Sequence, residues 1–246
     1  MEQKSHYLFG MHSVIEAVES NKKIEKVLFK QGLEGAQFRL LVEKLQEKEI
    51  PIQFVPAEKL NSITRGSHQG VIALISQVEY YPIEEMVENA FRKSRNPLIV
   101  LLDGVSDVRN FGAIARSAEC AGVAGIILPA KGGAAVNADA IKTSAGALLR
   151  ISTSKVANLR VAIYYLSESG FQIIAADEKA VKSIYEIDFK KPTAIIMGSE
   201  EKGISDSILA LSTDKAKVPL LGEIGSLNVS VAASVVMFEA VRQKNV

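Results

Sequence analysis

Three polar turns in the second half of the chain hold the residues whose types and spacing could do chemistry. In chain order they carry Asn110 and Arg116, then Gly198, Glu200 and Gly203, and finally Ser226 and Asn228. An arginine fork can bind a phosphate through two parallel hydrogen bonds, and a carboxylate or hydroxyl beside it can orient a substrate or move a proton. The side-chain amides of Asn110 and Asn228 add both hydrogen-bond donors and hydrogen-bond acceptors. The set therefore suits a site that binds and positions a polar substrate.

The glycine spacing of the second turn argues against two common nucleotide sites. Gly198 and Gly203 are five residues apart, but a phosphate-binding loop would continue with Lys and then Ser or Thr, where Ile204 and Ser205 stand. The chain also lacks GxGxxG, the usual signature of a dinucleotide-dependent oxidoreductase. ATP, GTP and dinucleotide binding are therefore disfavoured.

Taken one at a time, each of these residues also has an ordinary structural explanation. Asn110 could cap a helix, with Arg116 as a solvated residue of the same helix. Glu200 could be an exposed loop acid. Ser226 or Asn228 could cap the strongly apolar helix that ends the chain. Only the combination of the three turns favours a functional site.

Composition narrows the remaining classes of protein. With 246 residues, 48% of them hydrophobic and 23% charged, the chain is typical of a globular protein with one large domain or two small ones. Its 29 Lys and Arg residues nearly balance 28 Asp and Glu, which gives a net charge of +1. The basic excess that usually marks a nucleic-acid-binding protein is therefore absent.

Metal and membrane sites are not expected either. The only cysteine, Cys120, and the three histidines, His6, His12 and His68, match no metal-ligand spacing. No apolar run approaches the roughly 20 residues of a spanning helix, and the first 20 residues lack the apolar stretch of a secretory signal. We expect a cytoplasmic protein with no membrane partner.

The hydrophobic pattern predicts a small α/β domain at residues 1–77. Helices are expected at 10–20, 36–49 and 57–63, and strands at 24–30, 50–56 and 68–76. Residues 78–97 carry Pro82 and Pro97 and are predicted to be a linker with one helix.

Residues 98–246 are predicted to form a second α/β domain with a parallel sheet. Its expected strands are 98–102, 125–129, 172–176, 193–198 and 217–220. Its helices are expected to open on Asn110, Asn137, Asn158 and Ser205. The three polar turns follow strands of this sheet, and ligands in open α/β sheets bind outside the carboxyl ends of strands. The sheet is therefore the element that must bring the turns together.

In this order and spacing, the three turns resemble the three motifs of the SpoU, or TrmH-like, RNA ribose methyltransferases. The matching segments are NFGAIAR at 110–116, GSEEKG at 198–203 and SLNVSVA at 226–232, and the resemblance covers residues 98–246. The first domain, with YLFGMHSVIEAV and HQGVIA, is similar to the small RNA substrate-binding domain of the two-domain, RlmB-like branch.

The resemblance implies a fold, a cofactor and an assembly. The fold is a small α/β substrate-binding domain followed by a parallel α/β SPOUT domain with a trefoil knot near the C-terminus. The knot would bind S-adenosylmethionine, without a metal, and homodimers would form through the same region. By resemblance, the cofactor-binding residues are Gly198, Val218, Pro219, Leu220, Ser226, Leu227 and Asn228.

The implied reaction is methylation of a ribose 2′-hydroxyl in RNA. Arg116 is the implied central catalytic residue, with Asn110, Glu200, Ser226 and Asn228 orienting it and the nucleotide. A guanidinium stays protonated to about pH 12. Arg116 therefore has two alternative roles: it acts as a general base, or it binds the adjacent phosphate and stabilises the developing alkoxide.

The substrate and two rival functions stay open. Ribosomal RNA with a guanosine target is favoured, because the two-domain layout resembles large-subunit ribosomal RNA enzymes, and transfer RNA is the alternative substrate. The rival functions are a noncatalytic RNA-binding protein that retains the fold and a nucleotide-using α/β enzyme of another class.

Overall fold

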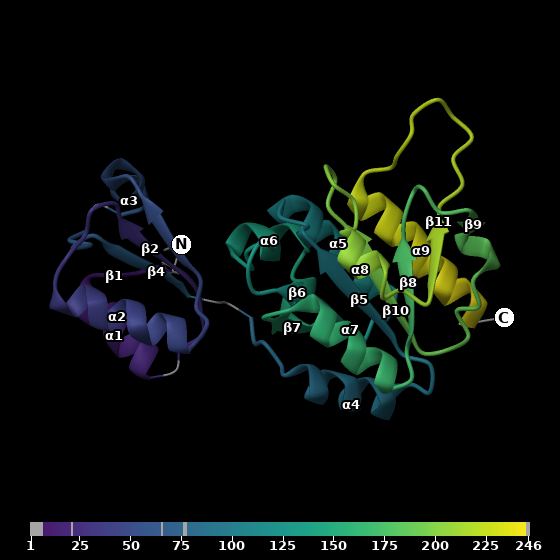
Figure 1. Ribbon diagram of the computed structural model, residues 1–246, viewed down its shortest axis with the longest axis horizontal. Coiled ribbons are helices and arrows are strands. Elements are labelled where there is room, and N and C mark those ends of the chain that lie inside the picture. The colour runs from purple at the N-terminus through teal and green to yellow at the C-terminus, as the bar shows by residue number, and fades with distance from the viewer. Residues whose placement is uncertain (1–6, 21, 65, 76–77, 245–246) are drawn as a thin grey trace. The chain divides into compact units, whose positions relative to one another are not determined.

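The computed structural model describes residues 7–20, 22–64, 66–75 and 78–244 (Figure 1). His6 lies outside these residues. The chain divides into two compact units, one of Met1–Gln77 with Val136–Ala138 and one of Val78–Ala135 with Asp139–Val246. Each unit has its own sheet.

The first unit is a four-stranded mixed sheet with three helices. Its elements are β1(Tyr7–Phe9), α1(Met11–Glu19), β2(Ile24–Lys30), α2(Ala36–Glu47), β3(Ile52–Val55), α3(Ala57–Ile63) and β4(Val71–Ile75). The strand order is β1-β4-β2-β3, and only β2 and β3 are parallel. Every helix and strand predicted for residues 10–75 is confirmed, and Ser76, the last residue of the predicted strand 68–76, lies outside the described residues. The short strand β1 was not predicted, because three residues carry too little alternation.

Two separate apolar clusters hold this sheet between its helices. Val14 of α1 and Leu41 of α2 pack with Phe29 of β2 in the larger cluster. Leu60 of α3 packs with Ile72 of β4 in the smaller one. The helices therefore cover both faces of the sheet, which removes the apolar residues of β2 and β4 from water.

The second unit is a seven-stranded, entirely parallel sheet in the order β7-β6-β5-β10-β8-β11-β9. Its strands are β5(Leu98–Asp103), β6(Gly125–Pro129), β7(Ser152–Val156), β8(Gln172–Ala176), β9(Lys182–Ser183), β10(Thr193–Gly198) and β11(Asp214–Lys217). The predicted parallel α/β sheet is confirmed. The polar strands β7 and β9 were not predicted, and the trefoil knot stays a prediction.

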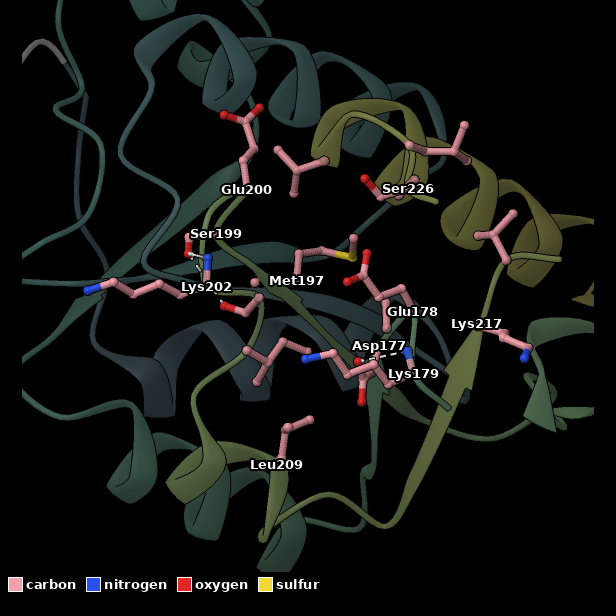
Figure 2. Close-up of a pocket in the computed structure, with 18 of the residues that line it drawn as sticks. Asp177, Glu178, Lys179, Met197, Ser199, Glu200, Lys202, Leu209, Lys217 and Ser226 are labelled. Carbon is pink, nitrogen blue, oxygen red and sulfur yellow. Dashed lines mark hydrogen bonds between the residues drawn. The ribbon is translucent and has the colours of Figure 1, made fainter. Parts of the chain in front are cut away.

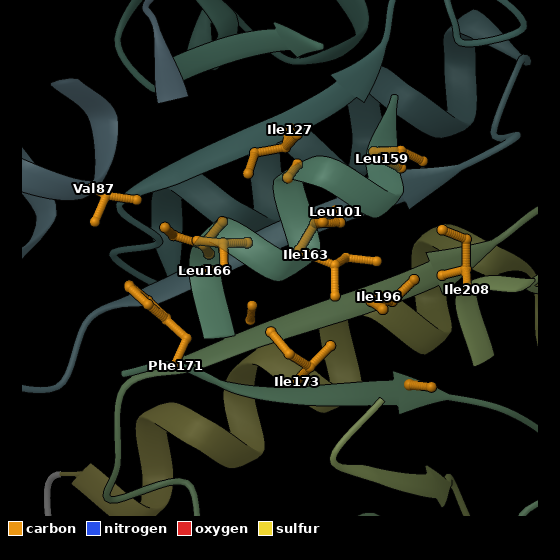
Figure 3. Close-up of a cluster of buried hydrophobic side chains, with 14 of the residues drawn as sticks. Val87, Leu101, Ile127, Leu159, Ile163, Leu166, Phe171, Ile173, Ile196 and Ile208 are labelled. Atoms are coloured by element: carbon orange, nitrogen blue, oxygen red, sulfur yellow. The ribbon is translucent and has the colours of Figure 1, made fainter. Parts of the chain in front are cut away.

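Helices cover both faces of this sheet. They are α4(Ile83–Lys93), α5(Val108–Cys120), α6(Ala138–Thr143), α7(Leu159–Glu168), α8(Asp206–Leu209) and α9(Val229–Lys244), with short 3-10 turns η1(Ala147–Leu149) and η2(Ile184–Glu186). Figure 3 shows the core on one face, where Leu166 of α7 and Ile208 of α8 surround Leu101 and Ile196 of the central strands. On the other face α5 packs against α9.

Helix α4 lies in the segment that the sequence pattern predicts to be a linker. Its Met86 and Val87 are buried in the core of the second unit, and Phe91 makes an edge contact with Phe171 at 5.1 Å between ring centroids. The Met86 side chain occupies the space that a Cβ of Gly125 on β6 would fill. The helix is therefore a structural part of the second unit.

Two details of the predicted elements are wrong. Helix α5 begins at Val108 and is capped by Asp107, so Asn110 lies inside the first turn and does not open the helix. Strand β11 ends at Lys217, so the predicted strand 217–220 is an irregular segment beyond the sheet. Pro219 explains this end, because proline has no N–H to donate to a neighbouring strand.

No helix within residues 7–20, 22–64, 66–75 and 78–244 is long and apolar enough to cross a membrane.

Candidate active site

The order of the central strands brings the polar turns to one edge of the parallel sheet. Strand β10 lies between β5 and β8, and its last residue, Gly198, is in register with Asp103, the last residue of β5. The next strand along, β11, pairs with β8. The carboxyl ends of four strands, and the turns that follow them, are therefore neighbours.

Three side chains from three different turns form a hydrogen-bonded cluster, Asn110–Glu200–Asn228. The Asn110 side-chain amide donates to the Glu200 carboxylate. The Asn228 Nδ2 donates to Asn110 Oδ1 and to Glu200 Oε1, both at 3.1 Å. Glu200 and Asn228 are exposed and Asn110 is half-buried, so their mutual bonds do not serve to satisfy fully buried polar groups. The structure thus assembles three of the five predicted catalytic residues.

Asp107 frees the side chain of Asn110 for this cluster. The Asp107 carboxylate accepts hydrogen bonds from the backbone N–H groups of Asn110 at 3.0 Å and Arg109 at 2.7 Å. These bonds favour the charged form and hold the pKa of Asp107 below its usual value. Because the helix is already capped, the amide of Asn110 can point to the other two turns.

Asn228 belongs to the cluster and also caps the terminal helix. Its Oδ1 accepts a hydrogen bond from the backbone N–H of Ser230 at 2.9 Å, and its carbonyl accepts from Ala232 at 2.9 Å. The helix α9 therefore starts with a fixed Asn228 side chain. Ser226 lies before the helix and does not cap it.

The turn that carries Glu200 is closed on itself. The backbone groups of Ser199 and Gly203 exchange hydrogen bonds of 3.0 and 2.9 Å, and Gly203 has a positive φ of 66°. A Cβ added to Gly198 would lie 2.2 Å from the carbonyl carbon of Gly203. Glycine is required at 198 because the chain folds back over it. Asp103 anchors the end of the turn by accepting from the N–H and hydroxyl of Ser205, both at 2.8 Å.

A cavity of about 510 Å³ opens beside the cluster. Six of the seven predicted cofactor-binding residues line it, namely Gly198, Val218, Leu220, Ser226, Leu227 and Asn228. Pro219 does not line it, although both of its neighbours do. Glu200 lines the cavity as well. Asn110 does not line the cavity, but its side-chain amide is hydrogen-bonded to Glu200.

One wall of the cavity was missed by sequence reasoning. It consists of Asp177, Glu178 and Lys179, which follow β8, and Figure 2 shows them opposite Ser226. The signal was available, because the predicted strand 172–176 ends at this polar run just as the other strands end at their turns. Met197 contributes an apolar side chain between the two walls.

Arg116 is not in the cluster and does not line the cavity. It lies six residues after Asn110 on α5, which is about 9 Å along the helix axis. Its side chain is exposed and has no hydrogen-bond or ion-pair partner among the described residues. The neighbouring Ser117 hydroxyl accepts a bond of 2.7 Å from Ser234 of α9, so the backbone beside Arg116 is held in place.

Residues 7–20, 22–64, 66–75 and 78–244 contain no group of three or more His, Cys, Asp or Glu side chains that could share a metal ion.

Two family profiles match this chain. The SpoU rRNA Methylase family matches residues 97–238, and the profile for RNA 2′-O ribose methyltransferase substrate binding matches residues 7–81. The chain belongs to the SpoU rRNA methylase family. This assignment confirms the resemblance read from the three motifs, and the protein is an RNA methyltransferase of the TrmH/SpoU type.

Relatives of this SpoU-family protein match it along nearly all of its length. The Bacillus subtilis protein YacO, whose name places it among the TrmH family tRNA/rRNA methyltransferases, is 31% identical over 245 residues and covers 100% of this chain and 98% of its own. A Staphylococcus haemolyticus protein with the same family name is 32% identical over 238 residues, which is 97% of this chain and 96% of its own.

Solved structures support the same family. An AdoMet-bound rRNA methyltransferase from Sinorhizobium meliloti has a TM-score of 0.62 at 25% identity, and the match covers 96% of this chain and 86% of that one. The A. aeolicus TrmH/SpoU tRNA modifying enzyme has a TM-score of 0.57 at 30% identity, and the match covers 66% of this chain and 82% of that one.

Proposed function

We propose that this SpoU-family protein transfers a methyl group from S-adenosylmethionine to a ribose 2′-hydroxyl in RNA. The observation that carries the proposal is the cluster Asn110–Glu200–Asn228 at the edge of the 510 Å³ cavity. Its three members come from turns that are far apart in sequence, and they are the polar residues that the three motifs share with the ribose methyltransferases.

The cavity fits the methyl donor in size and lining. Ligand pockets usually measure about 300–1,000 Å³ and combine apolar walls with a few polar groups. Val218, Leu220 and Leu227 offer apolar surface to an adenine ring, and Ser226 and Glu200 offer polar groups at the same wall. These residues would hold the cofactor, together with the backbone at Gly198.

The chemistry divides between the donor and the protein. When bound, S-adenosylmethionine supplies an electrophilic methyl group on a sulfonium. Transfer of this methyl group to the ribose oxygen would leave the donor as a neutral thioether, and the ribose hydroxyl would lose its proton to water. The cluster holds the nucleotide in line for this displacement, and positioning of this kind lowers a barrier by as much as roughly 7–11 kcal/mol.

Arg116 stabilises the developing charge on the ribose oxygen. A guanidinium keeps its proton at neutral pH, so it acts as a charged donor and not as a base. Its exposed fork, which has no partner in the part of the chain that the structure describes, is available to bind the phosphate next to the target ribose and the oxygen that loses its proton. Asn110, Glu200, Ser226 and Asn228 position the nucleotide relative to it.

Ribosomal RNA is the favoured substrate, with guanosine as the target nucleotide. The S. meliloti rRNA methyltransferase matches 96% of this chain, including the first unit, whereas the A. aeolicus tRNA modifying enzyme matches 66%. The first unit, residues 1–77, is the part that would bind RNA, as its family profile describes. Transfer RNA is the second candidate, since YacO is named for both substrates.

The protein acts as a homodimer in the cytoplasm. Val231 and Phe238 lie seven residues apart on α9, and each keeps 48% of its surface exposed. Leu221 and Ile224, in the loop before α9, are 102% and 80% exposed. Apolar side chains exposed in this way favour burial against a second copy. The predicted knotted region would then form the dimer interface.

Calorimetric titration with S-adenosylmethionine tests the proposed activity. We expect one donor bound per chain, with an affinity in the micromolar range or better, roughly −8 kcal/mol. A noncatalytic RNA-binding protein would show no binding, and a nucleotide-using enzyme of another class would bind ATP or GTP instead. Either of those results contradicts the proposal.

A further inference from the structure

Glu178 occupies a distinct place in the cavity wall. It follows β8, on the side of the cavity opposite the Asn110–Glu200–Asn228 cluster. Figure 2 shows its carboxylate directed into the cavity, toward Met197 and Ser226. The side chain therefore faces the space that a bound ligand would occupy.

Two of the other carboxylates that line the cavity, Asp177 and Glu200, already have partners, whereas Glu178 has none among the described residues. Asp177 Oδ1 accepts a hydrogen bond from the backbone N–H of Lys179 at 3.1 Å, which closes the turn after β8. Glu200 accepts from Asn110 and Asn228. The Glu178 carboxylate thus keeps its full acceptor capacity for a ligand.

The charge of the whole lining has the same sign as Glu178. Five carboxylates and three ammonium groups line the cavity: Asp177, Glu178, Glu200, Glu201 and Asp206 against Lys179, Lys202 and Lys217. A ligand with one more positive charge is therefore favoured over an otherwise similar ligand without it. S-adenosylmethionine and its demethylated product, S-adenosylhomocysteine, differ in this way, because the sulfonium becomes a neutral thioether.

We propose that Glu178 is a specificity-determining residue that makes the site prefer the cationic methyl donor to the neutral product. This inference rests on the proposed function, since it assumes that the cavity is the donor site. Loss of the positive charge on methyl transfer then weakens binding of the product, which favours its replacement by a new donor molecule.

Calorimetric titration of the full-length wild type and three full-length variants with both ligands tests the proposal. Glu178→Gln removes the charge at almost constant shape, and Glu178→Asp retains it. Glu168→Gln makes the same chemical change on exposed Glu168 at the end of α7, outside the cavity lining, and is the matched control. Both sites are exposed, so we expect unchanged folding of all three variants, checked by thermal unfolding.

We expect Glu178→Gln to weaken S-adenosylmethionine binding by about three- to tenfold and S-adenosylhomocysteine binding by less than about twofold. Glu178→Asp should keep most of the wild-type preference, and Glu168→Gln all of it. An unchanged ratio of the two dissociation constants in Glu178→Gln overturns the proposal. A wild-type protein that binds neither ligand contradicts the proposed function itself, which is a different result.

Discussion

Asn228 joins two roles in one side chain, because its Oδ1 caps α9 and its Nδ2 donates to Asn110 and Glu200. Substitution can separate the two. Asn228→Ser keeps a good capping group but is too short to reach the other two residues, whereas Asn228→Ala removes both functions. We expect both variants to lose most methylation, and only Asn228→Ala to lose about 0.5–2 kcal/mol of unfolding free energy.

Urea unfolding and a methylation assay on the same preparations measure the two effects. Full methylation by Asn228→Ser would show that the cluster does not position the substrate.

Arg116 allows a second test at the residue scale, because lysine keeps its charge but not its planar fork. We expect Arg116→Lys to lower turnover by about tenfold or more, and to leave the donor dissociation constant within about twofold of wild type, since Arg116 does not line the cavity. Single-turnover methylation and calorimetry separate the two quantities. Near-normal methylation by Arg116→Lys would contradict the bidentate role, and normal methylation by Arg116→Ala would remove Arg116 from the mechanism.

The polar residues of the cluster could be predicted from sequence, but their connections could not. The motifs single out Asn110, Glu200 and Asn228, yet the hydrogen bonds between them depend on β10 lying beside β5, which no local pattern shows. The expected cap at Asn110 is wrong for a local reason. Asp107 stands three residues earlier and is an equally good capping residue, and spacing alone does not rank the two.

At the scale of the elements, the turn after β10 depends on the missing side chain of Gly198. A Cβ there would meet the backbone of Gly203 at 2.2 Å and of Ile204 at 2.3 Å, so the turn that carries Glu200 would have to open. We expect Gly198→Ala to cost about 2–4 kcal/mol of unfolding free energy and to abolish donor binding.

Gly225→Ala is the matched control for stability, because a Cβ at Gly225 meets no atom within 4 Å. We expect it to unfold within about 0.5 kcal/mol of wild type. Equal stability of the two variants, followed by chemical denaturation, would show that the turn does not need glycine at 198.

The strands of the sheet were predictable to different degrees for a physical reason. Strands β5, β6, β8 and β10 are buried runs of apolar residues, which is the usual pattern of a parallel strand covered on both faces. Strand β7, with the sequence STSKV, pairs with β6 and makes one isolated bridge with Tyr80, and its polar residues give no such run. Its place at the edge of the sheet could be found only from the structure.

At the scale of the whole molecule, the boundary of the second unit has a measurable consequence. Met86, Val87 and Ala90 of α4 keep 1%, 5% and 2% of their surface exposed. A fragment of residues 98–246 would lose these contacts, while a fragment of residues 78–246 would keep them. We expect the longer fragment to be more stable by at least about 3 kcal/mol, as judged by denaturant unfolding.

We also expect the 78–246 fragment to bind S-adenosylmethionine like the full chain, because the cavity residues all follow position 175. Its RNA methylation should fall sharply without residues 1–77. A 98–246 fragment as stable as the longer one would show that α4 is only a linker.

The site of methylation on the nucleotide tests the account most directly. The protein is incubated with isotopically labelled S-adenosylmethionine and with transcribed large-subunit ribosomal RNA or transfer RNA, and the digested nucleosides are separated and identified by mass spectrometry. We expect the label in 2′-O-methylguanosine from ribosomal RNA. We also expect the phosphodiester bond next to that nucleotide to resist alkaline hydrolysis. Label on a base, or no label in either RNA from a protein that binds the donor, would contradict the proposed reaction.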